Sequence, residues 1–306
     1  MRSLPVFDDL RAFLGWAEAA GDLARLSAPV DLRHEMTAVQ LAGLRAGGPV
    51  LRFDAARRDG HPAGMPVIAN LFGTPARVAA GLGLAPGEVP GFGEFLAALR
   101  NPPPVEGMRD ALSKWPMLKA ALSTRPRLMQ RAPVQQVQPE PDLRAIPVQT
   151  CWPGDAGPLI TWPIVITRPP GADDPAAYNM GVYRMQVIGR ERAILRWLPM
   201  RGGAAHHHRW QEKGLEMPVA VVIGADPATL LASVKPAPEG VSELALAGMI
   251  GGRRVPVAQC ASIPLHVPTS AEIVLEGTVL PQETALEGPF GDHTGYYNAP
   301  ETYPVF

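Results

Sequence analysis

The spacing of apolar positions changes along the chain and divides it into two parts. In the first part apolar residues recur with the period of an amphipathic helix. Asp8 or Asp9 is placed to cap the first such helix, and Gly21 to end it. Helices are predicted over residues 10–20, 36–44, 75–81, 93–100 and 108–122, and short buried strands over residues 49–53 and 65–71. Residues 1–130 are therefore expected to form a small α/β domain.

From about residue 159 the pattern becomes mostly that of short strands. Strands are predicted over residues 160–167, 178–188, 193–198, 219–223, 255–258 and 272–279. Two helices interrupt them, one over residues 227–234 and one that Ser242 caps and that ends near Ile250. The proline-rich residues 132–158 are expected to be a linker that becomes the edge of this second unit. Residues 131–306 are thus predicted to form a β-barrel domain with inserted helices, and the fold class is α+β.

Composition narrows the possible functions. The chain has 306 residues, 46% of them hydrophobic and 19% charged, which is typical of a globular protein. Its net charge of -1 gives no general attraction to nucleic acid or to anionic membranes. Only Cys151 and Cys260 are present, and neither a signal peptide nor a membrane-spanning run is evident, so a cytoplasmic protein is expected. The strand-like ending at Phe306 predicts that the natural protein continues.

The first candidate site is a run rich in glycine and proline, residues 287–297, which we call the acidic turn. It carries Glu287 and Asp292. Alone it could be ordinary turn chemistry. Together with Arg184 it would form a network of one arginine and two carboxyl groups, in which one carboxyl group could keep a proton near neutral pH. Such a group can donate a proton to a reacting atom.

Arg184 lies in a predicted strand that also contains Asn179. Side chains alternate between the two faces of a strand, so Asn179 and Arg184 point to opposite sides of a regular one. A bulge or twist near Gly181 is needed to bring both to one site. The alternative is an edge-strand arginine in solvent and an asparagine in a turn.

The next segment combines arginine with glycine and is followed by histidines. Arg196, Trp197 and the run from Arg201 to Gly203 suit a phosphate cradle, although a polar hairpin tip would look the same. The sequence has neither a P-loop nor a dinucleotide-binding glycine motif. In the tract of residues 206–208, one or two histidines could reach a common metal site.

Glu243 is a candidate metal ligand. It follows the predicted helix cap Ser242, where the helix dipole alone favours an acidic residue. A carboxylate together with the amide oxygen of Asn179 also suits a hard divalent cation such as Mg²⁺ or Mn²⁺.

Taken together, several long motifs resemble the UbiD family of prenylated-FMN-dependent decarboxylases. These motifs are YNMGVYRMQVIG, LRWLPMRGGA, PVAVVIGADPATLLA, VSELALAGMIGG, VPTSAEIVLEG and EGPFGDHTGYYN. Within the family the chain looks most like the 3-polyprenyl-4-hydroxybenzoate decarboxylases. The resemblance implies an N-terminal α/β domain, a central split β-barrel related to flavin reductases, and a C-terminal α/β domain that is absent from this chain.

The resemblance also assigns roles to residues. Asn179 and Glu243 would hold Mn²⁺ or Mg²⁺ at the flavin phosphate, with His206 or His207 as a further ligand. The catalytic trio would be Glu287, Arg184 and Asp292. The prenylated FMN would be lined by Val182, Tyr183, Arg184, Arg196, Trp197, Leu198, Arg201 and Gly202.

The implied reaction is non-oxidative decarboxylation of 3-polyprenyl-4-hydroxybenzoate to 2-polyprenylphenol in ubiquinone biosynthesis. The electron-rich ring carbon would attack the cofactor, CO₂ would leave, and Asp292 or Glu287 would supply the proton. The resemblance further implies K⁺ as a second ion, a flavin prenyltransferase as cofactor supplier, a homo-oligomer, and contact with the inner face of the cell membrane. Two alternatives remain: a decarboxylase or carboxylase of another aromatic acid, and a non-catalytic flavin-binding module.

Overall fold

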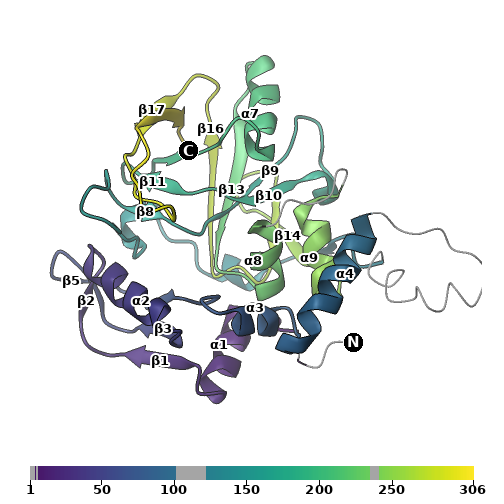
Figure 1. The fold of residues 1–306 in the computed structure, drawn as a ribbon. Coiled ribbons are helices and arrows are strands. Elements are labelled where there is room, and N and C mark those ends of the chain that lie inside the picture. Colours follow the sequence, from purple (N-terminus) through teal and green to yellow (C-terminus); the bar gives the residue numbers. More distant parts are fainter. Residues whose placement is uncertain (1–3, 5, 101–121, 235–240) are drawn as a thin grey trace, which may run out of the picture.

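The structure is a computed structural model, and it describes residues 4, 6–100, 122–234 and 241–306. Figure 1 shows the N-terminal residues, in purple and blue, below the later residues, in teal to yellow. Helices and strands are mixed throughout, as the sequence predicts. Most of the predicted helix over residues 108–122 lies outside the described residues.

The N-terminal part contains two small sheets and the helices around them. Asp9 caps α1 as predicted, because its side chain accepts a hydrogen bond from the Ala12 backbone N–H at 2.7 Å. One sheet has the order β1-β3-β6 and the other β2-β4-β5. The elements are α1 (Leu10–Ala19), β1 (Leu23–Leu26), β2 (Val30–Asp31), α2 (Glu35–Arg45), β3 (Val50–Phe53), β4 (Ala56–Arg58), β5 (His61–Pro62), β6 (Val67–Ala69), α3 (Pro75–Gly81), η1 (Pro86–Glu88) and α4 (Val89–Arg100).

The later part is built from mostly antiparallel sheets with helices between their strands; only the pair β14 and β7 among its described strands is parallel. Its largest sheet has the order β10-β9-β13-β16, and smaller ones have the orders β12-β11-β8, β15-β14-β7 and β17-β18. The strands are β7 (Arg127–Met129), β8 (Leu159–Ile160), β9 (Ile164–Thr167), β10 (Asn179–Val182), β11 (Met185–Val187), β12 (Ala193–Leu195), β13 (Met217–Ile223), β14 (Pro256–Gln259), β15 (His266–Pro268), β16 (Ile273–Val279), β17 (Thr284–Glu287) and β18 (Glu301–Pro304). The helical elements are η2 (Pro133–Gln136), η3 (Leu143–Ala145), η4 (Pro175–Ala177), α7 (Gly202–Glu212), α8 (Pro227–Val234) and α9 (Glu243–Gly251).

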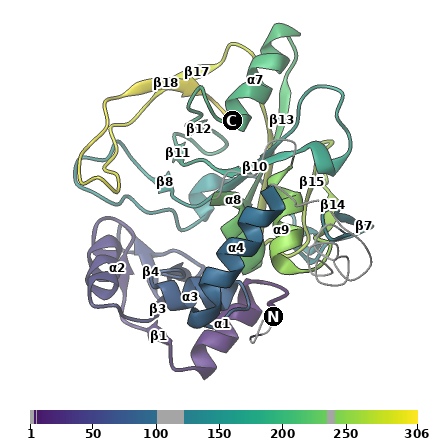
Figure 2. The ribbon, with the colours of Figure 1, turned by 45° about the vertical axis from the view of Figure 1, so that its right-hand side comes forward.

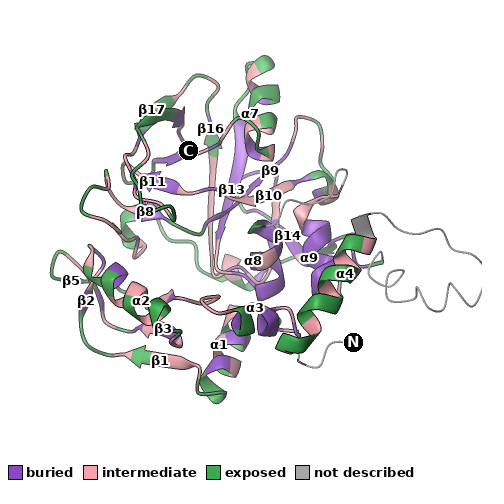
Figure 3. Ribbon diagram, in the orientation of Figure 1, coloured by how far each residue is buried: buried purple, intermediate pink, exposed green. Residues whose placement is uncertain are grey.

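Strand β13 forms the centre of the core. Its residues alternate between two apolar clusters: Ala220 and Val222 pack on the side of α8 and α9, whereas Val219 and Val221 pack on the other side. Both faces are therefore covered, which explains why the sequence of this strand is apolar without interruption. Figure 3 shows the same strand and the neighbouring α9 as buried. Among the described residues, no helix is both long and apolar enough to cross a membrane.

Two predictions from the sequence were wrong in detail. The strand predicted over residues 178–188 is two strands in different sheets, β10 and β11, with Tyr183 and Arg184 between them. A third helix, α7, occupies residues 202–212 of the later part. Two glycines at its start and three histidines in its first turns gave it a weak helical signal, since both residue types are poor helix formers.

The two parts of the chain meet along α1, α3 and residues 32–37. Arg253, which follows α9, forms an ion pair with Asp8 and donates to the Phe7 carbonyl at 3.0 Å. Gly81 at the end of α3 lies so close to α8 that an added Cβ would meet Pro227 Cβ at 3.2 Å. Figure 2 shows α3 and α8 close together from a second direction.

Candidate active site

Arg184 and Glu287 form the central ion pair of the candidate site. The guanidinium Nε donates to Glu287 Oε1 at 2.7 Å, and Nη2 donates to Oε2 at 3.0 Å. The side chain of Glu287 is fully buried, and that of Arg184 is 16% exposed. A carboxylate in such a position is strongly stabilised by its two charge-assisted hydrogen bonds, and removing either partner would leave a buried charge.

The local chain course brings this pair together. Arg184 lies between the end of β10 and the start of β11. Its side chain therefore need not follow the alternation of side chains between the two faces of a regular strand. Glu287 is the last residue of β17, and the next residue, Gly288, has a φ of 85° and donates its N–H to Gln186 Oε1 at 2.9 Å. A break does follow Gly181, at Tyr183 and Arg184, but Asn179 contacts Tyr183 and Arg184 contacts Glu287, so a shared site for Asn179 and Arg184 stays a prediction.

Asp292, the third member of the predicted trio, makes different contacts. Its Oδ1 accepts hydrogen bonds from the backbone N–H of Thr294, at 2.8 Å, and from the Thr294 hydroxyl. These bonds lower the pKa of the Asp292 carboxyl group below its ordinary value, with a small further contribution from the charges of His293 and Arg184. In this arrangement Asp292 is therefore ionised at neutral pH and directed toward its own turn.

The two predicted metal ligands lie side by side at the start of β10. Asn179 is the first residue of this strand. Glu243, in the first turn of α9, accepts the backbone N–H of Met180 through Oε2 at 3.0 Å. The structure thus brings an amide and a carboxylate from segments more than sixty residues apart to adjacent positions of one strand.

Of the three histidines, His206 lies nearest to this place. Its Nδ1 is 3.0 Å from Thr167 Oγ1, and Thr167 is the cross-strand partner of Asn179. Burial lowers the pKa of His206 to about 4, so its ring is neutral at pH 7 and has a lone pair for a metal ion. His207 is instead buried against Trp197, at 5.5 Å between ring centroids, and His208 is exposed beside Glu212.

The predicted cofactor residues gather around the first turn of α7. The Tyr183 hydroxyl lies 3.3 Å from both Asn179 Nδ2 and the backbone N of Gly203. Gly202 has no room for a side chain, because an added Cβ would lie 2.0 Å from Asn179 Oδ1. Trp197 packs edge-on against Tyr183, at 6.4 Å between ring centroids.

The other cofactor candidates have different surroundings. Arg196 lies over the ring of Tyr303, at 5.9 Å from its centroid, and its backbone N–H donates to the Arg184 carbonyl at 3.3 Å. Val182 and Leu198 are half-buried. Arg201 is the N-cap residue of α7 but makes no capping hydrogen bond through its side chain.

These residues fit an anionic flavin and a divalent cation. Trp197 Nε1 and Arg196 Nε are buried N–H donors for which the described part of the chain offers no acceptor. The start of α7 beside them presents backbone N–H groups and the positive end of the helix dipole, which favour phosphate. The amide oxygen of Asn179, the carboxylate of Glu243 and the neutral ring of His206 are suitable donors for Mn²⁺.

Two residues of the site were missed by sequence reasoning. Asn298 Oδ1 accepts a hydrogen bond from Arg184 Nη2 at 2.8 Å, so it is a second partner of this arginine. Asp155 accepts the backbone N–H of Gly291 at 3.0 Å and so contacts the acidic turn. Asn298 directly follows the Tyr-Tyr pair of that turn and could have been noticed, whereas nothing in the sequence links Asp155 to a turn more than a hundred residues away.

Comparison with known proteins places this geometry in a family. The "3-octaprenyl-4-hydroxybenzoate carboxy-lyase Rift-related domain" (UbiD) matches residues 127–306, and the corresponding N-terminal domain matches residues 14–91. The UbiD-class enzyme HmfF from Pelotomaculum thermopropionicum in complex with FMN is 31% identical, with a TM-score of 0.79. That match covers 97% of this chain and 60% of that chain, so the chain spans about three fifths of its relative's length.

Two further solved structures have the same fold. An evolved dimeric form of HmfF from the same organism, in complex with prFMN, is 30% identical over 98% of this chain and 64% of that chain, with a TM-score of 0.80. Vanillic acid decarboxylase from Sedimentibacter hydroxybenzoicus, in closed form, is 24% identical, with a TM-score of 0.81. It covers 98% of this chain and 60% of that chain, and at this identity it supports the fold alone.

Proposed function

Because the chain belongs to the UbiD family, we propose that it is the cofactor- and metal-binding part of a carboxy-lyase that acts on an aromatic acid with prenylated FMN. The observation that supports this most directly is the buried, bidentate pair of Arg184 and Glu287 beside the unpartnered N–H groups of Arg196 and Trp197. An arginine with a buried carboxylate can orient an acid and move a proton, and the free N–H groups await an anionic ligand.

For the cofactor, we propose the residues around the start of α7 as the binding site. HmfF has been solved with FMN and with prFMN, which supports a flavin in this relative of it. When bound, prenylated FMN supplies the electrophile and the electron sink for loss of CO₂. The antiparallel sheets around β13 support the split β-barrel expected of this domain, with the domain boundary proposed near residue 130.

For the metal, we propose Asn179, Glu243 and His206 as protein ligands. His206 is preferred to His207 because Thr167, its hydrogen-bond partner, is paired with Asn179, whereas His207 is packed against Trp197. Mn²⁺, Mg²⁺ and K⁺ remain predictions at this site.

Within the reaction, the residues of this chain have separate tasks. Arg184 uses Nε and Nη2 to bind Glu287 and Asn298, which leaves Nη1 to orient the carboxylate of the substrate. The proton that replaces CO₂ would come from Glu287 or from Asp292. Glu287 is bound by Arg184 and Asp292 by Thr294, so the hydrogen bonds of this arrangement do not separate the two candidates.

Family membership supports an aromatic acid as substrate but does not select a polyprenyl tail. The prediction of 3-polyprenyl-4-hydroxybenzoate and of ubiquinone biosynthesis was therefore narrower than the comparisons support, and another aromatic acid is the better-supported alternative. The flavin prenyltransferase and the membrane contact stay predictions. A homo-oligomer also stays a prediction, with some support from the evolved dimeric form of HmfF.

Turnover can be tested directly with protein that has been co-expressed with a flavin prenyltransferase and supplied with Mn²⁺. CO₂ release would be measured from prenylated 4-hydroxybenzoate and from a panel of unprenylated aromatic acids. We expect release from at least one acid, and we expect Glu287→Gln to lower it by about a hundredfold or more while flavin absorbance is retained.

Glu283→Gln is the matched control, because Glu283 belongs to the same hairpin but pairs with the exposed side chain of Arg192. It should leave turnover unchanged. Bound flavin without CO₂ release from any acid would favour the flavin-binding module instead. Protein that binds no flavin would contradict the proposed cofactor.

A further inference from the structure

Residues 149–156 form a short segment, here called the strap, that joins the N-terminal part to the later part. On the N-terminal side, the His34 backbone N–H donates to the Thr150 carbonyl at 2.9 Å, and the Thr150 N–H donates to the Leu32 carbonyl at 3.2 Å. The Thr37 hydroxyl also donates to Gln149 Oε1 at 3.3 Å. One end of the strap is therefore fastened to the segment that leads into α2.

The other end of the strap is fastened to the acidic turn. Asp155 Oδ1 accepts the Gly291 N–H at 3.0 Å, and the Ala156 N–H donates to the Pro289 carbonyl at 2.9 Å. The Gly154 N–H donates to the Tyr297 hydroxyl at 3.0 Å. These bonds reach the turn at three points between Glu287 and Asn298, the two residues that hold Arg184.

Asp155 also organises the strap itself. Its second carboxylate oxygen, Oδ2, accepts the backbone N–H groups of Cys151 at 3.1 Å and of Trp152 at 2.9 Å. The Trp152 ring lies so close to Gly291 that an added Cβ there would be 2.5 Å from Trp152 Cδ1. One carboxylate thus holds together the strap, the indole ring and the backbone of the acidic turn.

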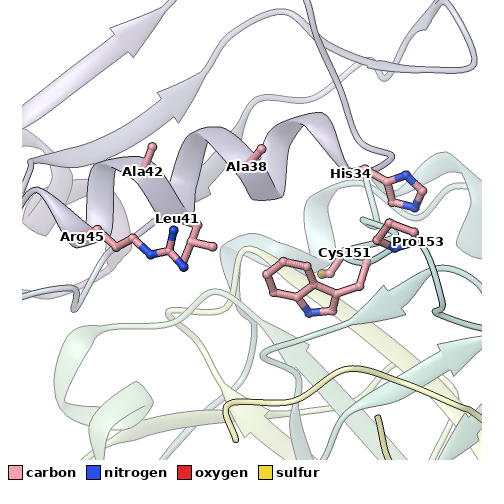
Figure 4. A pocket seen from close by; sticks show the side chains of 8 residues that line it. His34, Ala38, Leu41, Ala42, Arg45, Cys151 and Pro153 are labelled. Atoms are coloured by element: carbon pink, nitrogen blue, oxygen red, sulfur yellow. The ribbon is translucent and has the colours of Figure 1, made fainter. Parts of the chain in front are cut away.

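Packing does not hold the strap on its outer side. A cavity of about 360 Å³ lies between α2 and residues Cys151 to Pro153. Figure 4 shows Leu41 and Arg45 of α2 on one side of it and Cys151 and Pro153 on the other. Since a cavity offers no close contacts on that side, the position of the strap depends on its hydrogen bonds, and Asp155 accepts three of them.

We propose that Asp155 is a positioning residue, which holds the acidic turn so that Glu287 meets Arg184. Asp155 contacts neither of these two residues, and it acts through the backbone of Gly291 and the ring of Trp152. Its effect on turnover rests on the proposed function, but its effect on the turn does not. The same contacts make the position of the acidic turn depend on the N-terminal part of the chain.

The position of the turn can be tested by hydrogen–deuterium exchange, which needs neither cofactor nor substrate. In Asp155→Ala the amides of residues 287–297 should exchange about tenfold faster or more, since three hydrogen bonds to a carboxylate are lost. Peptides from β13 should exchange as in the wild type. Asp155→Asn should give an intermediate increase in exchange. The asparagine side chain keeps one oxygen that can accept hydrogen bonds, whereas its NH₂ group can only donate them.

Asp142→Ala is the matched control, since Asp142 also accepts backbone and side-chain hydrogen bonds but from Arg144, away from the acidic turn. It should leave exchange in residues 287–297 unchanged. Unchanged exchange there in Asp155→Ala would overturn the proposal. An equal increase in every peptide would also overturn it, because that result means general destabilisation.

In a preparation that releases CO₂, Asp155→Ala should lower kcat by about a hundredfold through misplacement of the turn. KM and flavin affinity should change little, because Asp155 touches none of the proposed binding residues. If the wild-type chain releases no CO₂, the exchange experiment still decides the role of Asp155. If kcat is unaffected although exchange rises, the turn is positioned by Asp155 but does not limit the reaction.

Discussion

At the scale of single residues, the described part of the chain contains several polar side chains that are buried for different reasons. The carboxylate of Glu287 is satisfied by Arg184, and the N–H of Trp210 by the Arg168 carbonyl at 2.7 Å. Trp197 Nε1 and Arg196 Nε have no such acceptor. A buried donor without a partner is costly, and Arg77 Nε, Arg168 Nε and His207 Nε2 are in the same position, so these two groups are consistent with a bound ligand but do not single out its place.

The two cysteines give a prediction at this scale. Burial raises the pKa of the Cys260 thiol, and neighbouring Glu276 raises it further. Burial also raises the pKa of Cys151, but a hydrogen bond with Thr37 opposes this effect. Because the thiolate is the reactive form, both thiols should react with a disulfide reagent more slowly than free cysteine at pH 7, and faster as the pH rises.

Cys151 should react first, since it lines the cavity beside α2, whereas Cys260 is 6% exposed. Thiol titration with the reagent would measure both rates. Cys151→Ser should abolish the faster phase and Cys260→Ser should leave it intact; faster modification of Cys260 would contradict the burial described for it.

At the scale of elements, the site depends on how closely α7 approaches β10. The helix begins with two glycines, and its first turn lies against Asn179 and Trp197. Any side chain at Gly202 would occupy the space of the Asn179 amide. The glycine pair therefore lowers the stability of the helix. It permits the close approach of α7 to Asn179 and Trp197, for which any other residue is too large.

Gly202→Ala should consequently weaken binding of both FMN and Mn²⁺. An added Cβ would lie 2.0 Å from Asn179 Oδ1, so the amide has to move away from the place proposed for the metal. We expect both dissociation constants, measured by flavin fluorescence and equilibrium dialysis, to rise by about tenfold or more, the effect of one lost charge-assisted hydrogen bond.

Gly189→Ala provides the control for this substitution, because its Cβ would make only an ordinary contact, 3.7 Å from Arg192 Cβ. It should bind both ligands as the wild type does. Undiminished binding by a folded Gly202→Ala protein would count against the proposed metal position.

At the scale of the whole molecule, the two parts of the chain are joined by packing more than by surface charge. The ion pair of Arg11 and Glu272 spans 2.7 Å, but Arg11 is 80% exposed, so its contribution to stability is small. The contact of α3 with α8 is closer and apolar, with Gly81 facing Phe72 and Pro227. Loss of this contact should loosen the N-terminal part from the remainder.

Gly81→Val tests this junction. An added Cβ at Gly81 would lie 2.9 Å from Phe72 Cε1 and 3.2 Å from Pro227 Cβ, so the larger side chain forces the helices apart. We expect the free energy of unfolding, measured with urea, to fall by about 1–3 kcal/mol.

The comparison variant is Gly87→Val, where an added Cβ meets nothing within 4 Å. Its free energy of unfolding should change by no more than about 0.5 kcal/mol. Equal effects of the two substitutions would show that α3 and α8 are not tightly packed.

By itself the sequence determined the mixture of helices and strands, the capping of α9 by Ser242, the capping of α1 by Asp8 or Asp9, of which the structure has Asp9, and the family. These features depend on local residue patterns or on long motifs, which need no distant contact. It also indicated that Arg184 and Glu287 act together, a pairing that the structure contains.

Only the tertiary structure decided how these residues meet. The break between β10 and β11, the helix α7 and the different surroundings of His206 and His207 result from packing between distant segments. Asp155 is the clearest case, since its importance comes from a hydrogen bond to Gly291, 136 positions later in the chain. Such a contact leaves no local trace, because side-chain spacing records which face of an element is buried but not which partner covers it.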